Sequence, residues 1–219
     1  MSPSITGIGM TSQRTRQRML ERLREKGIRN EHVLGALAAV PRHVFVDEAL
    51  ASRAYEDTAL PLGHSQTISQ PFIVARMIEV LLEGRGGLGK TLEIGTGCGY
   101  QAAVLAQLTD NLYSVERISA LLDQAKENLS KIQLGHVKLR YADGHMGIPD
   151  AAPFDTIIVA AAANRVPPGL LQQLAIGGRI ALPVGTLDQQ LLLVERKVDG
   201  MVEKRLDPVK FVPMLPGTE

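Results

Sequence analysis

The sequence predicts an α/β protein built on a mostly parallel sheet that ends in an antiparallel hairpin. From Lys90 onward, short apolar runs alternate with amphipathic stretches, which is typical of strands joined by right-handed helical crossovers. A glycine-rich turn separates the first of these strands from its helix. Near the end, Asp199 and Gly200 lie between two strand-like runs with no helix between them, which is typical of a β-hairpin.

Each expected element before this region follows from a local pattern. Residues 11–26 are rich in helix formers, with Met19, Leu20 and Leu23 on one side. A second helix is expected over 31–40, because Pro41 ends it. Residues 42–70 are mixed, and Pro61 and Gly63 mark a loop. Pro71 suits the first turn of a helix whose apolar face extends to Leu82.

The alternating region supplies the sheet. The expected strands are 91–95, 111–116, 137–143, 154–160 and 179–184, and the expected helices are 100–108, 120–131 and 169–175. The hairpin strands follow, with the first over 191–198. We expect a single domain over 1–219, with a flexible tail (1–10), a helical substrate-side segment (11–89), a cofactor-binding core (90–185) and the hairpin region (186–219).

Composition excludes several classes of protein. The chain has 219 residues, of which 45% are hydrophobic and 21% charged, with a net charge of +1, so a sizeable core is expected and neither a polyanion partner nor an acidic tail is indicated. One cysteine, Cys98, rules out an internal disulfide, and the histidines show no metal-ligand spacing, so no metal is expected. No apolar run approaches the roughly 20 residues of a membrane span, and the N-terminus lacks a secretory pattern, so a cytoplasmic protein is expected.

The glycine turn is the strongest local motif. Gly95, Gly97 and Gly99 lie between a strand and a helix, where they allow the backbone to turn sharply and to approach a ligand closely. Glu116 ends the next strand, roughly 20 residues further on, where an acid accepts hydrogen bonds from ribose hydroxyls. A plain strand-to-helix turn is the alternative for the glycines alone; strand, helix and acid together favour a nucleoside ligand.

Two further acids suggest which nucleoside. The dinucleotide fingerprint needs a third glycine where this chain has Tyr100, so that motif is not matched. Glu93, in the strand before the turn, is expected to repel a pyrophosphate and attract a cationic ligand, which favours S-adenosylmethionine over NAD. Asp143 and Gly144 end the third strand, where the acid suits an adenine amino group; a simple turn is the alternative for this pair.

A second segment narrows the interpretation. The glycine turn resembles that of a class I methyltransferase. The chain also resembles the protein-L-isoaspartate O-methyltransferase family over nearly its whole length, through the segments ALPLGHSQTISQPFIVARM (59–77), PRHVFV (41–46) and KFVP (210–213). The resemblance implies a doubly wound seven-stranded sheet of the Rossmann-like methyltransferase fold. Ser65 and Cys98 stand where the family often has a glycine and a serine.

The resemblance also implies a set of site residues. It places the active-site serine at Ser69. Spacing alone favours a cap of the helix that starts at Pro71, and the two roles need not exclude each other. The implied cofactor-binding residues are Gln66, Thr67, Ile68, Glu93, Gly95, Thr96, Gly97, Gly99, Glu116, Arg117, Asp143 and Gly144. The implied substrate-binding residues are Thr58, Leu60, Pro61, Ser69, Val212 and Pro213.

The implied reaction moves a methyl group from S-adenosylmethionine to the free α-carboxylate of an L-isoaspartyl residue in a damaged protein or peptide, and the ester then cyclises to a succinimide. A carboxylate is already ionised near pH 7, since its reference pKa is about 3.5–4, so no general base is required. Alignment of the two reactants is the main task of the protein.

Two other functions remain as alternatives at this stage: a class I methyltransferase that acts on RNA or a small metabolite, and a non-catalytic protein that binds S-adenosylmethionine. Residues 90–170 carry no concentration of basic residues, which disfavours RNA. A basic stretch at 14–29 suits a solvated helix face better than a nucleic-acid contact. We expect a monomer whose partners are isoaspartyl proteins and peptides, without nucleic acid or membrane.

Overall fold

The computed structural model describes residues 7–219, and the first six residues of the expected tail lie outside that range. Its main sheet has seven strands. Across the sheet, the first five strands pair in parallel, and the last two are added through antiparallel pairings. In sheet order these are β5 (Lys138–Tyr141), β4 (Leu112–Glu116), β3 (Thr91–Ile94), β6 (Phe154–Val159), β7 (Leu174–Val184), β8 (Gln189–Lys197) and β9 (Gly200–Val209). The predicted sheet and the hairpin at Asp199 and Gly200 are therefore confirmed.

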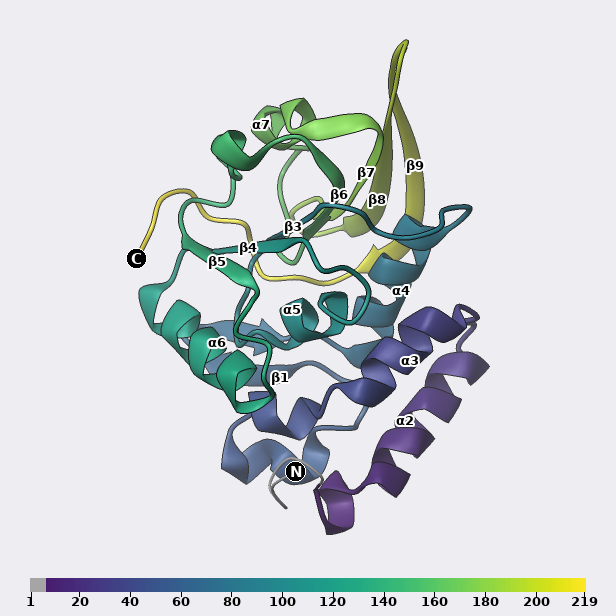
Figure 1. Cartoon of the computed structure of the whole chain (residues 1–219), viewed down its shortest axis with the longest axis vertical. Coiled ribbons are helices and arrows are strands. Elements are labelled where there is room, and N and C mark those ends of the chain that lie inside the picture. The colour runs from purple at the N-terminus through teal and green to yellow at the C-terminus, as the bar shows by residue number, and fades with distance from the viewer. Residues whose placement is uncertain (1–6) are drawn as a thin grey trace.

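Helices cover both faces of the sheet (Figure 1). On one face lie α4 (Pro71–Leu82), α5 (Tyr100–Leu105) and α6 (Ser119–Lys131), while the short α7 (Pro168–Gln172) covers the other. Alternation along β6 divides the core: Ile157 and Val159 pack with Leu170 of α7, and Ile158 faces the cluster shared with α4 and α5. The fold is thus doubly wound, as the resemblance implied.

The N-terminal part packs beneath α4 and α5. Here α2 (Gln13–Glu25) buries Met19 and Leu23 of the apolar side that the sequence predicted, and α3 (Glu31–Ala39) buries Leu37. Short 3-10 helices lie at Gly9–Thr11, Arg42–Phe45 and Glu48–Arg53. In the basic stretch, Arg16 and Arg22 donate hydrogen bonds to the carbonyls of Ala38 and Tyr55, so part of it serves to hold the helix to the fold.

Two local expectations need correction. The segment at Pro61 and Gly63, expected as a loop, belongs to an antiparallel hairpin of β1 (Leu60–Gly63) and β2 (Gln66–Ile68), turned at His64 and Ser65 with positive φ. The helix expected over 169–175 ends at Gln172, because Leu174 already pairs with Phe154 of β6. A short apolar run fits a strand as well as a helix, and the pairing partner decides.

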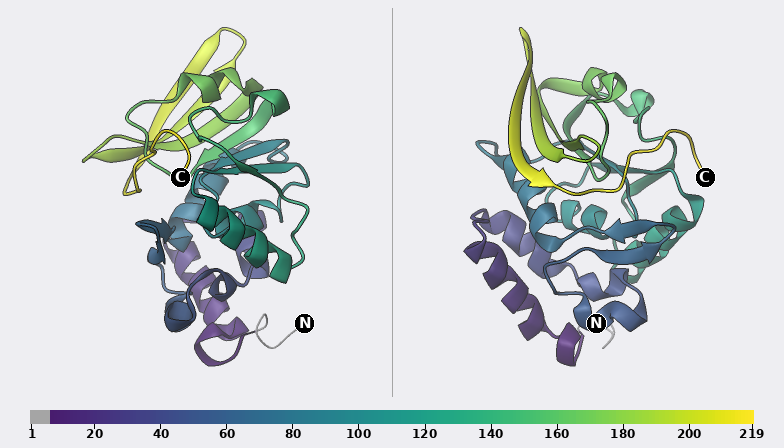
Figure 2. Two further views of the ribbon diagram at one scale, coloured as in Figure 1. Left: turned by 90° about the vertical axis from the view of Figure 1, so that its left-hand side faces the viewer. Right: turned by 180° about the vertical axis from the view of Figure 1, so that it is seen from behind.

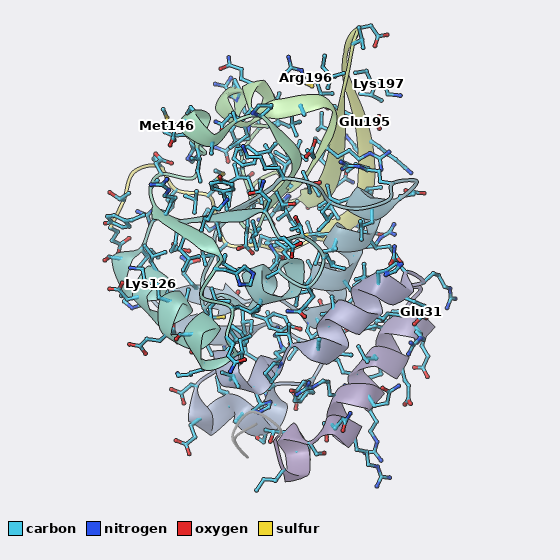
Figure 3. All side chains as sticks on the ribbon, in the orientation of Figure 1. Glu31, Lys126, Met146, Glu195, Arg196 and Lys197 are labelled. Atoms are coloured by element: carbon cyan, nitrogen blue, oxygen red, sulfur yellow. The ribbon has the colours of Figure 1, made fainter. Side chains whose placement is uncertain are left out.

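The C-terminal hairpin extends away from the helices (Figure 2). Figure 3 shows Glu195, Arg196 and Lys197 of β8 at the end of the molecule opposite α2. After β9 the chain turns back and crosses the carboxyl ends of the parallel strands, finishing beside β4 and β5 (Figure 1). Within the described residues, no helix is long and apolar enough to cross a membrane.

Candidate active site

One cavity of about 760 Å³ opens at the carboxyl ends of β3 and β4. We call its two sides the glycine-loop wall (residues 94–97 and 115–118) and the hairpin wall (residues 58–70 and 208–215). The sequence-predicted residues that line the cavity are Thr58, Gln66, Thr67, Ile68, Ser69, Gly95, Thr96, Gly97, Glu116, Arg117, Gly144, Val212 and Pro213. Most of the predicted site residues, drawn from five separate segments, thus meet in one place.

The glycine-loop wall depends on left-handed backbone. Gly95, Gly97 and Gly99 have φ angles of +93°, +54° and +90°, which residues with a Cβ rarely adopt. The amide of Gly97 donates to Glu116 Oε2 at 2.8 Å, so the next strand holds the loop open. Gly144 is required for a different reason: an added Cβ would lie 2.5 Å from Ile94 Cγ2.

Glu116 is fixed by the backbone around it. Its Oε1 accepts from the amides of Arg117 (2.8 Å) and Ile118 (2.9 Å), in addition to the Gly97 bond on Oε2. A carboxylate has about four lone-pair positions, so these three donors leave capacity for a further hydroxyl. Only 5% of the residue is exposed, and it lines the cavity, as expected for an acid that meets a ribose.

Glu93 does not have the role that the sequence indicated. It lies on the sheet face opposite Leu92 and Ile94, is completely buried, and is not part of the cavity lining. Burial raises its pKa to about 8, so the carboxyl is neutral near pH 7. Its interaction is internal, because the Ser114 hydroxyl donates to Oε2. The prediction that Glu93 attracts a cationic ligand is therefore wrong.

Ser69 lines the cavity and does not cap α4. The N-cap position belongs to Gln70, whose side chain makes no capping bond. Asp57 supplies that function from outside the helix, since its Oδ1 accepts from the Phe72 amide at 2.8 Å. Within residues 7–219 the Ser69 hydroxyl has no assigned hydrogen bond, which leaves it available to a ligand. The capping alternative is excluded, and sequence reasoning missed Asp57 because it lies far from the helix along the chain.

The C-terminal segment engages two residues predicted to bind the cofactor. Asp143 Oδ2 accepts from the Gly217 amide at 2.7 Å, and Asp143 itself is not part of the lining, although its neighbour Gly144 is. Arg117 donates to the carbonyl of Gly217 and forms an ion pair with Glu219 at 3.0 Å. The end of the chain is thus attached beside the cavity, over the ends of β4 and β5.

Three more predicted residues lie away from the cavity lining. Gly99 starts α5 and packs against α6, where an added Cβ would meet Ala125 and Leu129 at 3.3 Å. Leu60 is buried in the core and is 1% exposed, and the neighbouring Pro61 is exposed. These three residues shape the two walls of the cavity without lining it.

Sequence reasoning also missed residues that the cavity includes. Gln101 follows the glycine turn directly, yet nothing in its type or spacing marked it. Lys210 and Phe211 belong to the KFVP segment, of which only Val212 and Pro213 were singled out. Proximity to a recognised motif was the available signal in both cases.

Comparison with known proteins identifies relatives over the full length of the fold. The model of the family described as protein-L-isoaspartate(D-aspartate) O-methyltransferase matches residues 13–219. The protein-L-isoaspartate O-methyltransferase of Dechloromonas aromatica is 68% identical over 97% of this chain and 99% of that relative. The enzyme of the same description from Methylobacillus flagellatus is 59% identical over 99% of both chains.

Solved structures agree with this result. A protein-L-isoaspartate O-methyltransferase superposes with a TM-score of 0.81 at 29% identity, over 90% of this chain and 65% of that longer one. A protein from Plasmodium falciparum, described as a putative protein-L-isoaspartate O-methyltransferase in complex with S-adenosyl-L-homocysteine, has a TM-score of 0.77 at 25% identity, over 91% of this chain and 98% of that one.

Proposed function

The chain belongs to the protein-L-isoaspartate(D-aspartate) O-methyltransferase family, and from that membership we propose how its cavity performs the reaction. The enzyme transfers a methyl group from S-adenosylmethionine to the free α-carboxylate of L-isoaspartyl residues in damaged proteins and peptides. In our proposal the glycine-loop wall holds the cofactor and the hairpin wall holds the substrate. One observation carries this assignment: Ser69 and the loop Gly95–Gly97 line the same cavity from separate segments.

The residues present suit an adenosine ligand with an amino-acid end. Glu116 has a lone pair available for a ribose hydroxyl, Gly144 lines the same cavity, and the main chain of Gly95, Thr96 and Gly97 permits close approach. Gln66, Thr67 and Ile68 border the same space from the hairpin. When bound, the cofactor supplies a methyl group on a sulfonium, which is a good leaving group.

The protein has little acid–base chemistry to perform. The α-carboxylate of an isoaspartyl residue is ionised near pH 7, with a pKa of about 3.5–4, so it attacks without a general base. Ser69 donates a hydrogen bond to one carboxylate oxygen and leaves the other directed at the methyl carbon. Such alignment contributes up to several kcal/mol as effective molarity. The backbone amide nitrogen of the next residue then attacks the methyl ester, methanol leaves, and the succinimide that forms begins repair.

Recognition of the isoaspartyl link falls to the hairpin wall. Thr58, Val212 and Pro213 offer main-chain groups along which an extended peptide can lie. Lys210 stands exposed at the edge of the cavity, where its charge attracts the free carboxylate that an ordinary aspartyl peptide lacks at that point of its backbone.

A paired methylation assay tests this function. Two peptides of one sequence, differing only in an aspartyl or an isoaspartyl link, are incubated with the protein and methyl-labelled S-adenosylmethionine. Base-labile label on the isoaspartyl peptide alone is the expected result. Cofactor binding with no label on either peptide would contradict the proposal and leave a different acceptor, such as RNA or a metabolite, or a binding role.

We also infer that the enzyme acts as a monomer in the cytoplasm. Every residue assigned above comes from one chain, so the site needs no second copy for its lining. The only cysteine, Cys98, is buried and free, which suits a reducing compartment. Light scattering of the purified protein should give the mass of one chain, and a dimer whose dissociation abolishes turnover would contradict the inference.

A further inference from the structure

Asp57 connects the substrate side of the cavity to the start of α4. Its side chain is 7% exposed, and the next residue, Thr58, lines the cavity. Asp57 Oδ1 accepts from the amide of Phe72 at 2.8 Å, and Oδ2 accepts from Gln70 Nε2 at 3.0 Å. The main-chain carbonyl of Asp57 accepts from the same Gln70 nitrogen at 3.0 Å. We call these three hydrogen bonds the Asp57 tether.

Ser69 lies between two fixed points of the chain. Before it, Ile68 is 3% exposed and pairs with Leu60 across the hairpin of β1 and β2. After it, the side chain of Gln70 is attached to Asp57 through the tether. The direction of the Ser69 Cα–Cβ bond depends on both neighbours, so the place of its hydroxyl in the cavity depends on the tether as well as on the hairpin.

The tether starts from a fixed part of the fold. The segment before Asp57 is held by Arg42, which is completely buried and donates from Nε to the carbonyl of Ala54 at 2.8 Å. On the solvent side, Lys26 forms an ion pair with Asp57 Oδ2. A carboxylate that is mostly buried needs such compensation for its charge. Asp57 is therefore a fixed point from which the start of α4 is held.

We propose that Asp57 is a positioning residue for the methyl transfer, and that it acts through Ser69. The inference rests on the proposed function, in which the Ser69 hydroxyl donates to the substrate carboxylate. A misplacement of roughly 1 Å can cost about a hundredfold in the rate of an aligned reaction. Loss of the tether should therefore slow the transfer while cofactor binding by the glycine-loop wall stays unchanged.

A double-mutant cycle tests whether Asp57 acts through Ser69. For Asp57→Ala at saturating peptide and cofactor, we expect the kcat on an isoaspartyl peptide to fall about tenfold and the Kd for S-adenosylhomocysteine to stay within about twofold of wild type. Asp57→Asn retains an acceptor for the Phe72 amide and should recover part of the rate. The double variant Asp57→Ala/Ser69→Ala should be no slower than Ser69→Ala, because the tether then has no hydroxyl to position. Losses of kcat that multiply in the double variant would overturn the proposal.

Asn30 provides the matched control for stability. Like Asp57, it accepts from backbone amides in the first turn of a helix: its Oδ1 accepts from His32 at 3.0 Å and from Val33 at 3.2 Å in α3, and it is not part of the cavity lining. Asn30→Ala and Asp57→Ala should lower the unfolding temperature by similar amounts, while only Asp57→Ala loses kcat. An equal loss of kcat in both variants, or an unchanged kcat in Asp57→Ala, would overturn the proposal.

Amide hydrogen exchange separates this inference from the proposed function. In Asp57→Ala, the amides of Ser69, Gln70 and Phe72 should exchange about tenfold faster than in wild type, while those of residues 94–97 exchange as before. Unchanged exchange at the three amides would overturn the proposal. This measurement needs no turnover, so it tests Asp57 even if the wild-type enzyme were to leave isoaspartyl peptides unmethylated, a result that would count against the proposed function.

Discussion

The two walls of the cavity are built in different ways. The glycine-loop wall comes from consecutive residues at the end of one strand and from the end of its parallel neighbour, and Glu116 joins the two through the Gly97 amide. The hairpin wall combines a two-stranded hairpin with the segment after β9, more than a hundred residues away in the chain. The first wall follows from local sequence, while the second exists only once the fold has assembled.

The largest effect on ligand binding is expected in the glycine-loop wall. Gly95→Ala forces a Cβ into φ +93° and against Ala160 at 3.4 Å, which costs roughly 1–2 kcal/mol and moves the loop. We expect the Kd for S-adenosylhomocysteine to rise at least tenfold by calorimetry. Gly84→Ala is the control, because its φ is +70° with open space around it. An equal loss of affinity in both variants would mean that the loop acts only through stability.

The buried acid behind the same wall predicts a pH effect on stability. The pKa of Glu93 rises from its ordinary 4.5 to about 8 on folding, so between these values the unfolded chain releases a proton that the folded one keeps. The wild type therefore loses about 1.4 kcal/mol of stability per pH unit relative to Glu93→Gln over this range. Urea titrations at pH 5.5 and 7.5 should show the difference shift by roughly 2–3 kcal/mol in favour of the variant. A constant difference would mean that Glu93 is ionised in the folded protein.

Asp57 provides a contrast on the hairpin side. Its Oδ1 accepts from the Phe72 amide at 2.8 Å and its Oδ2 bonds Gln70 and Lys26, so Asp57→Ala should lower the free energy of unfolding by about 1–2 kcal/mol. Ser69→Ala should change it by less than about 0.5 kcal/mol, because Ser69 is not the cap. A larger loss in the free energy of unfolding for Ser69→Ala than for Asp57→Ala, measured by urea denaturation, would show that Ser69 is the cap after all.

The smallest effect is expected where the C-terminal segment crosses both walls. The Glu219 side chain is 65% exposed, and its pair with Arg117 is worth less than about 1 kcal/mol. Glu219→Gln should therefore shift the unfolding temperature by no more than a few degrees, and less in high salt. A larger shift by calorimetry would show that this segment holds the ends of β4 and β5 together.

The contrast between the glycine-loop wall and the hairpin wall also explains which parts of the site could be predicted from the sequence. The alternating apolar runs predicted the strands and the helices that connect them. The glycine turn and Glu116 predicted the cofactor side of the cavity, because neighbouring parallel strands end at the same edge of the sheet. Ser69 and Pro213 came only through family resemblance. The prediction for Glu93 failed because the position of a residue in the sequence does not reveal which face of the sheet it occupies. Glu93 lies on the face that α5 covers. Asp57 was missed because its role depends on neighbours brought together by folding.

One wall binds the cofactor and the other aligns the substrate in our proposal, and Ser69 tests that division directly. For wild type and Ser69→Ala, the Kd for S-adenosylhomocysteine and the kcat on an isoaspartyl peptide at saturating cofactor should be measured in the same preparations. We expect the kcat of the variant to fall about tenfold to a hundredfold while its Kd stays within twofold of wild type. A weakened Kd with an unchanged kcat would contradict the account and place Ser69 with the cofactor.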